Sequence, residues 1–391
     1  MHLTPSDQLI LSSVRVHPTA ADLEALDALI PLIDDWDYLS RTIIERGIGP
    51  LFFNKLSLLS NAALIPEVTR TNLQQAYFRT LSRSMVLYDA FRRVADAFAV
   101  NHIQVVALKG IHLAEWLYGD IGLRQFSDID LLVKREDGEK CLNILTELGF
   151  VQSGDEVSNT IMEYSGIVHY PAMVRNDVSV EIHINLHRRQ KPYSLDARKI
   201  IENSESLLIN QLEVHVPELH DLLIFLCIHL DKHFTQGDIQ FTSFNDITNL
   251  IDLHGEDIDW ERCISRSKEF KCESFVFKYL LLVNRFFNVP LPDSILQKYA
   301  STIGEQEEQI FIRYLNGFKN HPYGATTHLK NIAEIKDTSE KLRYLLKVVF
   351  PSRKFMTGSY PMKYPSLFWL YYPSRHWKGL KGLWRMVWKP L

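Results

Sequence analysis

The chain has 391 residues, of which 46% are hydrophobic and 23% charged, and its formal net charge is −4. This length allows two or three domains, and the composition is that of a globular protein, which excludes a chain that is disordered throughout. The four cysteines form no CxxC pair. We therefore interpret them as reduced, mostly buried thiols rather than a disulfide framework or a zinc site.

The ends of the chain differ in character. The N-terminus lacks a basic stretch followed by a long apolar one, and no window approaches about 18 uninterrupted apolar residues, so we expect a cytoplasmic protein without a membrane span. Residues 341–391 carry eleven Lys or Arg, no Asp or Glu, and four of the seven tryptophans. The rest of the chain then sums to −15, from −4 less +11. This basic tail predicts an anionic partner.

The first 98 residues are predicted to be helical. Apolar residues recur with helical spacing over 22–33 and 36–47, and the second of these segments stops at a glycine. Residues 72–98 form a long amphipathic pattern without Pro or Gly. We therefore expect three helices before the period changes.

The next segment alternates between strand and helix patterns. Residues 103–108 are short and β-branched, and Lys109-Gly110 ends them. The segments 111–118 and 136–148 have helical patterns that stop at glycines, and between them 128–133 (DIDLLV) is typical of a buried strand. Residues 161–187 indicate a hairpin with its turn near Arg175-Asn176-Asp177 and its second strand at 178–186.

From about residue 217 the helical period returns. The predicted helices are 220–234, 244–253, 260–270 and 275–287, followed by a more polar helical stretch over 301–347. The fold class predicted is α+β, a small mixed-sheet core between helical segments. The domains expected are an N-terminal helical segment 1–98, an α/β core 99–215, a C-terminal helical domain 216–347 and a basic aromatic tail 348–391.

The strand DIDLLV carries the clearest chemical signal. Because strand side chains alternate between faces, Asp128 and Asp130 point the same way while Ile129 points to the core. Two carboxylates this close repel each other unless a cation lies between them, and Mg²⁺ is the natural choice, with Mn²⁺ as an alternative. Glu181 lies in the middle of an otherwise apolar strand, and it completes the metal site if the two strands are neighbours. These three carboxylates are the predicted catalytic and metal-binding residues.

Several nearby residues are candidates for binding phosphate. Lys109 and Gly110 follow a strand and open a helix, where free N–H groups bind anions and a glycine allows close approach. Lys109 and Arg124 each offer a positive charge to a triphosphate. Lys109 is alternatively a surface lysine at a turn, and Arg124 a structural partner of Asp128. His183 shares the face of Glu181 and is placed to reach the phosphates or the acceptor.

The stretch ALKGIHLAEWLYGDIGLRQFSDIDLLV and the later Glu181-Ile182-His183 resemble the nucleotidyltransferase superfamily of the DNA polymerase β type. Within it, the sequence looks most like an uncharacterised bacterial nucleotidyltransferase family. The resemblance covers most of the chain but is weak after residue 300. It implies that Asp128, Asp130 and Glu181 are metal ligands and that Lys109 and Gly110 line the phosphates of an NTP. The superfamily turn is usually Gly-Ser or Gly-Gly, and here it is Gly110-Ile111.

A second cluster lies on the predicted helix 220–234. His229 and His233 are four residues apart and therefore share a helix face. The favoured interpretation is a pair of structural histidines bonded to backbone or to Asp246. The alternatives are a metal site, although the glutamate of the HExxH pattern is absent, and a wall of the nucleotide pocket formed by His229, Lys232 and His233. The resemblance favours the pocket wall over the metal site.

The tail allows three interpretations. In the first, the tail is an amphipathic anchor that lies on a membrane surface. In the second, it folds back on the rest of the chain, which has a net negative charge. In the third, it binds RNA or another anionic acceptor. Folding back is favoured because residues 368–372 (FWLYY) would otherwise be badly exposed.

The leading functional hypothesis is a Mg²⁺-dependent nucleotidyltransferase that moves a nucleotide from an NTP to an acceptor and releases pyrophosphate. The acceptor is not determined by the sequence, and a small molecule, a peptide and RNA all stay open. The second hypothesis is a non-catalytic protein that binds a nucleotide or another partner through the same fold. The third is a metal-dependent phosphohydrolase built on His229 and His233.

Overall fold

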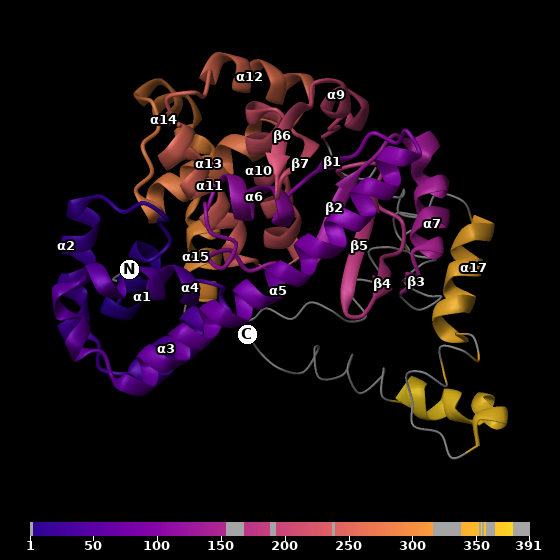
Figure 1. Cartoon of the computed structure of the whole chain (residues 1–391), viewed down its shortest axis with the longest axis horizontal. Coiled ribbons are helices and arrows are strands. Elements are labelled where there is room, and N and C mark those ends of the chain that lie inside the picture. Colours follow the sequence, from indigo (N-terminus) through magenta and orange to yellow (C-terminus); the bar gives the residue numbers. More distant parts are fainter. Residues whose placement is uncertain are drawn as a thin grey trace.

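The computed structural model describes residues 3–153, 168–187, 193–236, 239–315, 338–351, 353, 356 and 364–377. Helices surround one mixed sheet, and most of the structure is helical (Figure 1). The predicted α+β class is therefore confirmed. Residues 154–167, the start of the predicted hairpin among them, lie outside the described residues.

The N-terminal segment is helical, as predicted. Its helices are α1 (Pro5–Ser12), α2 (Ala20–Leu29), α3 (Trp36–Glu45), α4 (Gly49–Lys55) and the long α5 (Glu67–Val100). Threonines cap α1 and α2, each in a capping box with an Asp three residues later. Figure 1 shows α5 running from these helices to the sheet. The spacing of apolar residues therefore located α2, α3 and α5 correctly, while α1 and α4 were not predicted.

The described strands form one sheet in the order β3-β4-β5-β2-β1-β7-β6. Their bounds are β1 (Val106–Ala107), β2 (Asp128–Leu132), β3 (Val151–Gln152), β4 (Met173–Arg175), β5 (Val178–His183), β6 (Glu205–Ile209) and β7 (Leu212–Val216). The central strand β2 is parallel to β5 and antiparallel to β1, and β1 is parallel to β7. The predicted mixed sheet is thus confirmed, with β1 shorter than the predicted 103–108.

Two hairpins build the outer parts of the sheet. The hairpin β4–β5 turns at Asn176 and Asp177, both with positive φ, which is the turn that the sequence predicted. The hairpin β6–β7 turns at Asn210 and Gln211, again with positive φ, and was not predicted. Gln is an unusual residue for this conformation, so the turn gave little sequence signal.

The two faces of the sheet are covered differently. Alternate residues of β2 and β5, including Ile129 and Val180, are buried in one apolar cluster with side chains of α5 and of α7 (Gly138–Glu147). The residues between them in sequence point to the other face. This alternation places Asp128, Asp130 and Glu181 on the face away from α5 and α7.

The helices that follow β5 share one apolar cluster with the N-terminal helices. They are α9 (Ala197–Glu202), α10 (Leu219–Gln236), α11 (Phe241–His254), α12 (Trp260–Glu269), α13 (Glu273–Phe287), α14 (Asp293–Tyr299) and α15 (Glu305–Leu315). The four predicted helices over 220–287 are confirmed by α10 to α13. Among the described helices, none has the length and hydrophobicity needed to cross a bilayer.

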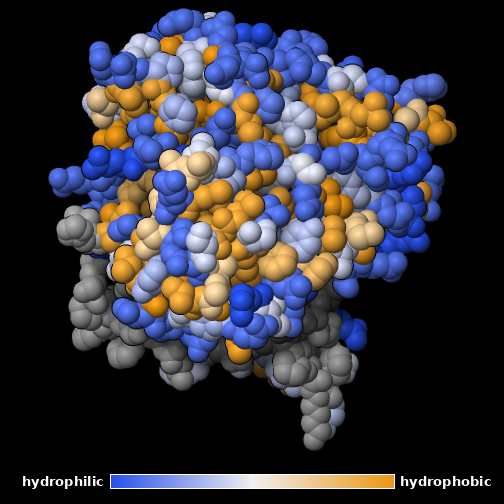
Figure 2. Space-filling view, turned by 60° about the vertical axis from the view of Figure 1, so that its left-hand side comes forward, coloured by the Kyte–Doolittle hydropathy of each residue, from blue (hydrophilic) through white to orange (hydrophobic). Residues whose placement is uncertain are grey.

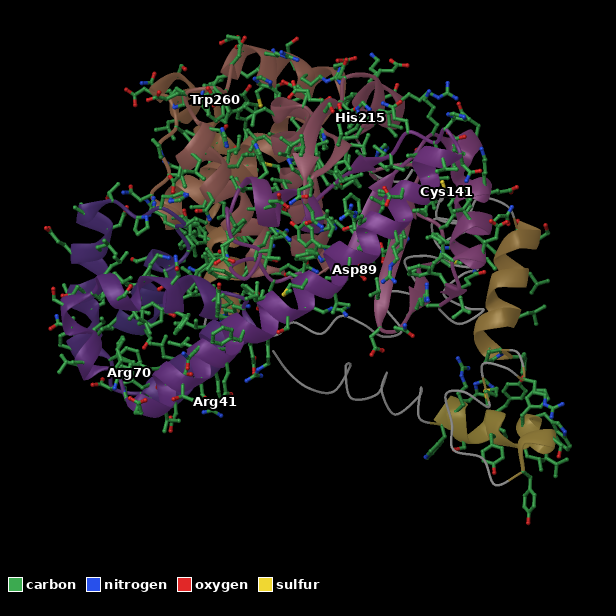
Figure 3. The ribbon with its side chains drawn as sticks, viewed as in Figure 1. Arg41, Arg70, Asp89, Cys141, His215 and Trp260 are labelled. Carbon is green, nitrogen blue, oxygen red and sulfur yellow. The ribbon has the colours of Figure 1, made fainter. Side chains whose placement is uncertain are left out.

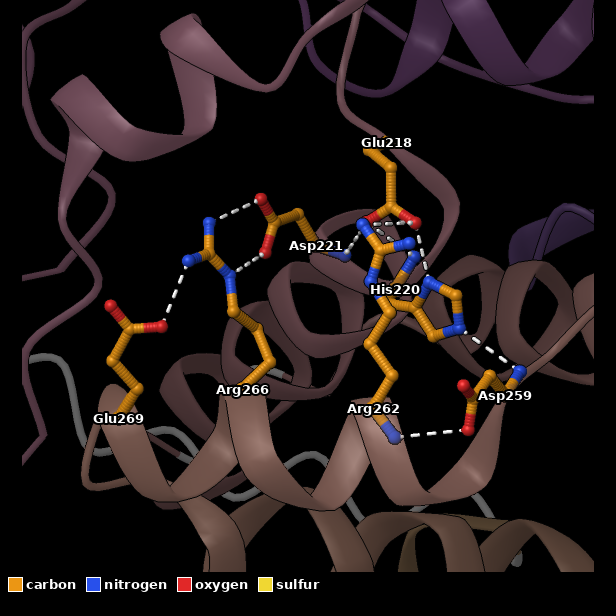
Figure 4. Close-up of polar contacts among 7 residues, drawn as sticks. All are labelled: Glu218, His220, Asp221, Asp259, Arg262, Arg266 and Glu269. Atoms are coloured by element: carbon orange, nitrogen blue, oxygen red, sulfur yellow. Dashed lines mark hydrogen bonds and ion pairs between the residues drawn. The ribbon is translucent and has the colours of Figure 1, made fainter.

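A polar network fixes the start of α10 against α12 (Figure 4). Arg266 of α12 makes a two-pronged ion pair with Asp221 of α10, with N–O distances of 2.7 and 2.8 Å. His220 bonds to Glu218 and accepts a hydrogen bond from the backbone N–H of Asp259 at 3.0 Å. Because an α-helix is stiff, this anchor also fixes the residues two and three turns further along α10.

The described part of the tail lies at the edge of the molecule. α17 (Thr338–Val349) and the 3₁₀ segment η6 (Pro365–Tyr371) stand beyond α7, away from the C-terminal helices (Figure 1). Trp369 and Leu370 are each 54% exposed. The expectation that the tail buries residues 368–372 by folding back is therefore wrong for Trp369 and Leu370, whereas Phe368, Tyr371 and Tyr372 are partly buried. Trp384 and Trp388 lie outside the described residues.

Candidate active site

Asp130 and Glu181 lie side by side at the centre of the sheet. β2 and β5 are parallel neighbours, and their register pairs Asp130 with Glu181 and Leu132 with His183. One ligand atom each from Asp130, Glu181 and His183 lies within 4.8 Å of the others. The pairing of strands that the sequence analysis required is therefore present. Among the described residues, this is the group of three that has the ligand types and spacing of a metal site.

Asp130 is buried and held by two positively charged or hydrogen-bonding partners. Lys109 Nζ lies 2.9 Å from its Oδ2, and His183 Nε2 lies 2.8 Å from its Oδ1. Burial by itself raises the pKa of this carboxyl, but Lys109 and His183 outweigh burial and hold the pKa well below its usual range. Asp130 is thus a stable carboxylate anchor at the bottom of the site.

Asp128 has the opposite electrostatic behaviour. Burial and the adjacent Asp130 raise the pKa of Asp128 to about 6, and Lys109 only partly offsets them. The two aspartates therefore share a face as predicted, and their pKa values are driven apart. At neutral pH the negative charge of the carboxylates in this cluster exceeds the positive charge beside them. A bound cation would offset this excess.

The raised pKa of Asp128 predicts how stability varies with pH. A carboxyl whose pKa is higher in the folded chain than its free value of 3.8 binds its proton more tightly when folded. Its contribution to stability is therefore present below about pH 4 and is lost as the pH rises through 6. Asp128→Asn has no such loss. Without divalent metal, we expect this variant to exceed the parent chain in unfolding free energy by on the order of 2 kcal/mol at pH 7.5.

Urea unfolding in the presence of a chelator, at pH 4 and at pH 7.5, measures this difference. The excess stability of Asp128→Asn should vanish at pH 4, where Asp128 is protonated in the folded chain. Asp89→Asn, on the exposed side of α5, is the matched control (Figure 3). An Asp128→Asn chain that is no more stable at pH 7.5 would contradict the crowding of charge described above.

His169 is part of the site, and sequence reasoning missed it. It forms an isolated bridge with His183, and its Nε2 lies 3.7 Å from Glu181 Oε2. The register of β4 with β5, for example Met173 with Val180, extrapolates to residue 170 opposite His183. The observed bridge is shifted by one residue, and a shift of this kind reverses which face a side chain occupies. A hairpin prediction alone therefore could not place His169 at the carboxylates.

His183 shares the face of Glu181, as predicted. Its Nε2 lies 2.8 Å from Asp130 Oδ1 and 3.6 Å from Glu181 Oε2, and its contact with the phosphates or the acceptor stays a prediction. Burial lowers the pKa of His183, but the bonds to these two carboxylates outweigh burial and raise it. His183 therefore bridges the acidic residues of β2 and β5.

The turn Lys109-Gly110 lies beside Asp130, to which Lys109 is paired. α6 (Gly110–Trp116) begins at Gly110, and a Cβ added there would lie 2.5 Å from Cδ2 of Phe126.

We expect Gly110→Ala to lower the free energy of unfolding by about 1–3 kcal/mol because the ring of Phe126 or the turn must move. Chemical denaturation measures this. The double variant Gly110→Ala/Phe126→Leu should recover part of the loss, and an equal loss in both variants would argue against the clash.

Arg124 lies in a buried ion pair rather than beside the carboxylates. Its Nε and Nη2 lie 2.8 and 2.6 Å from the two carboxylate oxygens of Asp246 on α11, and Tyr118 donates a further hydrogen bond to Asp246. Both charged side chains are almost fully buried. The guanidinium thus joins the turn before β2 to α11, and binding of phosphate by Arg124 stays a prediction. The proposed alternative partner, Asp128, is not the one the structure gives it.

α10 presents its histidines to the same region. The rings of His229 and His233 are 4.5 Å apart, so the predicted shared face is confirmed. Burial is the main cause that lowers the pKa of His229, and the positive charge of Lys109 is the next. His229 is therefore close to the Lys109–Asp130 pair. Asp246, the predicted partner of these histidines, is bonded to Arg124 and Tyr118.

The chain matches the model of a known family. The model of a family described as "Uncharacterised nucleotidyltransferase" matches residues 34–288, more than half of the chain. The chain belongs to this family. The resemblance seen in the sequence is therefore confirmed, and the matched residues of the uncharacterised nucleotidyltransferase family run from just before α3 to the end of α13.

A solved structure and the curated proteins add little detail to the family assignment. The solution structure of the antibiotic-resistance factor ANT(2'')-Ia is similar over 52% of this chain and 97% of that chain, with 10% sequence identity and a TM-score of 0.35. No curated protein matches the chain. Within the uncharacterised nucleotidyltransferase family, the residues that carry chemistry must therefore be argued from the site itself.

Proposed function

We propose that the protein transfers a nucleotide from an NTP to an acceptor hydroxyl or similar nucleophile, with Mg²⁺ held by Asp128, Asp130 and Glu181. The observation that carries this proposal is the register of the parallel strands β2 and β5, which sets Asp130 beside Glu181, while Asp128 lies two residues before Asp130 on the same face of β2. Membership of the nucleotidyltransferase family supports it. Two adjacent carboxylates and a third from a neighbouring strand are what two-metal phosphoryl transfer requires.

The chemistry of the donors fits a divalent cation. Asp130, Glu181 and His183 have ligand atoms within 4.8 Å of one another. Asp130 and Glu181 are carboxylates, which Mg²⁺ prefers, and the imidazole of His183 is a ligand that Mn²⁺ also accepts. Burial and, after it, the charge of Asp130 raise the pKa of Asp128 in spite of Lys109, and a bound cation would favour the charged form of this carboxyl. When bound, the metal would lower the pKa of the attacking hydroxyl and neutralise charge that develops on the α-phosphate.

The side chains around the carboxylates supply the other functions. Lys109 and the α10 residues His229, Lys232 and His233 are proposed to bind the triphosphate, because they bring hydrogen-bond donors and positive charge close to Asp130. A new bond forms between the acceptor oxygen and the α-phosphorus, and the bond to the pyrophosphate oxygen breaks. Glu181 is proposed to accept the proton of the acceptor.

Two observations favour a second function, nucleotide binding without turnover. Asp130 already has both of its oxygens engaged, one by Lys109 and one by His183. Gly110 is followed by Ile111, so the hydroxyl that a serine would offer to a phosphate is missing. A protein that senses a nucleotide needs the pocket but not a reactive metal pair.

Two measurements separate these functions. Isothermal titration with each of the four NTPs, with and without Mg²⁺, tests binding, and release of pyrophosphate in the presence of size-fractionated cell extract tests transfer. We expect Mg²⁺-dependent binding and release that depends on one extract fraction, which also gives the size class of the acceptor. Binding with no release in any fraction would support the second function, and no binding of any NTP would reject both.

A further inference from the structure

The described part of the tail exposes an apolar face at helical spacing. Leu342, Leu346 and Phe350 recur every four residues along and just past the end of α17, so they lie on one side of the helix. Each is more than half exposed, between 52% and 59%. On η6 and the helical residues after it, Trp369, Leu370 and Trp377 are 54% to 61% exposed. Such a set of large apolar side chains is costly to leave in water.

The same segment is strongly basic. Residues 341–391 contain eleven Lys or Arg and no acidic residue, whereas the rest of the chain sums to −15. Among the described residues of this segment, Arg353 is exposed and Lys341 half-buried beside Leu342. The tail also lies outside residues 34–288, which the family model matches. Its charge and its apolar face therefore belong to a feature separate from the proposed active site.

Contacts within the tail join its described parts to one another. Tyr372 donates a hydrogen bond to the backbone oxygen of Pro351 at 2.6 Å, and Phe350 packs edge-on against the Tyr372 ring. Arg375 donates to the backbone oxygen of Val349 at 3.3 Å. These bonds join the end of α17 to the residues after η6. The segment therefore keeps a defined shape while its apolar face stays uncovered at the edge of the molecule (Figure 1).

We propose that this tail binds the surface of an anionic lipid bilayer, with the leucines and aromatic side chains in the interface and the lysines and arginines at the headgroups. Charge complementarity selects an anionic surface. The aliphatic residues at helical spacing select a bilayer over RNA, because RNA is bound by phosphate contacts and by stacking on aromatic rings, neither of which uses leucine. Tryptophans mixed with basic residues are typical of a membrane interface.

Flotation of the full chain with lipid vesicles tests this proposal. Vesicles of phosphatidylcholine with about 30% phosphatidylserine are compared with vesicles of phosphatidylcholine alone. We expect at least about tenfold tighter binding to the anionic vesicles, a blue shift of tryptophan emission on binding, and a marked loss of binding as salt rises from about 0.1 M to about 1 M. Equal binding to both vesicles, or to neither, would overturn the proposal.

Variants assign the binding to the apolar face. Leu342→Ser/Leu346→Ser/Leu370→Ser, which leaves the packing of Phe350 on Tyr372 intact, should weaken binding to the anionic vesicles at least about tenfold. The control is Leu58→Ser/Leu64→Ser/Val68→Ser, which removes equally exposed apolar side chains from the N-terminal segment. Figure 2 shows apolar and polar side chains mixed on the face where the N-terminal helices come forward. The control should bind as the parent chain does.

Two further results decide between partners. All substitutions are at exposed positions, so circular dichroism should be unchanged in both triple variants. Single-stranded RNA added to the vesicle mixture should compete weakly with the anionic vesicles. A chain that binds RNA and does not float with vesicles would overturn the proposal, and so would a tail variant that binds vesicles as well as the control does.

Discussion

Asp130→Asn is expected to lower the rate of nucleotide transfer by about 10³-fold or more, measured as pyrophosphate release with the acceptor-containing fraction. Asn keeps the shape of the side chain but not its charge. The proposed metal then loses the carboxylate at the centre of its site, between Lys109 and His183. Binding of an NTP in the absence of Mg²⁺ should change little, because the α10 donors remain.

Asp89→Asn separates loss of chemistry from loss of structure. Asp89 is an exposed residue of α5 that pairs with Arg93 (Figure 3). Its replacement should leave both activity and stability within ordinary error. Asp128→Asn should lose transfer to the same degree as Asp130→Asn, although it is expected to be the more stable of the two without metal. Combining the two substitutions should add little further loss.

Retained transfer in Asp130→Asn or in Asp128→Asn would reject the metal-binding assignment. A folded Asp130→Asn chain that binds NTP with its usual Mg²⁺ dependence would reject it as well. If both variants lose Mg²⁺-dependent binding while the parent chain shows no transfer, the carboxylates hold a metal in a protein that only binds nucleotides.

Local patterns in the sequence were sufficient for the central elements of the fold. The helical spacing of apolar residues in α5 and α10 continues over many turns. A single residue that departs from the spacing therefore does not hide the helix. β2 is short, but its two aspartates alternate with buried residues, and this fixes both the strand and its two faces. Glu181 could be placed because it is the one acidic residue of β5. These inferences need information from only a few neighbouring residues.

The features that the sequence did not predict depend on distant partners. Arg124 and Asp246 are 122 residues apart, and nothing near Arg124 distinguishes a phosphate ligand from a structural ion pair. His169 reaches the carboxylates through a one-residue shift in register that no composition rule reveals. The exposure of Trp369 depends on how α17 and η6 pack. In each case long-range packing decides what the local pattern leaves open.

Arg124→Met is expected to lower the free energy of unfolding by about 3–5 kcal/mol, because it leaves the buried carboxylate of Asp246 with the hydroxyl of Tyr118 as its remaining partner. Methionine preserves most of the volume, so the loss reports on charge rather than on a cavity. Chemical denaturation gives the value. Arg93→Met, which breaks an exposed pair on α5, is the control and should cost less than about 1 kcal/mol.

A double-mutant cycle shows whether the pair acts as a unit. Asp246→Leu removes the other charge, and Arg124→Met/Asp246→Leu should cost clearly less than the sum of the single variants, since no unpaired buried charge remains. Titration with NTP distinguishes the two roles considered for Arg124. A structural role leaves the Kd of the folded variant within about twofold, whereas a phosphate ligand loses at least about tenfold. A small stability loss together with weakened NTP binding would return Arg124 to the nucleotide site, because a side chain held so firmly by Asp246 can contact phosphate only if that pair opens.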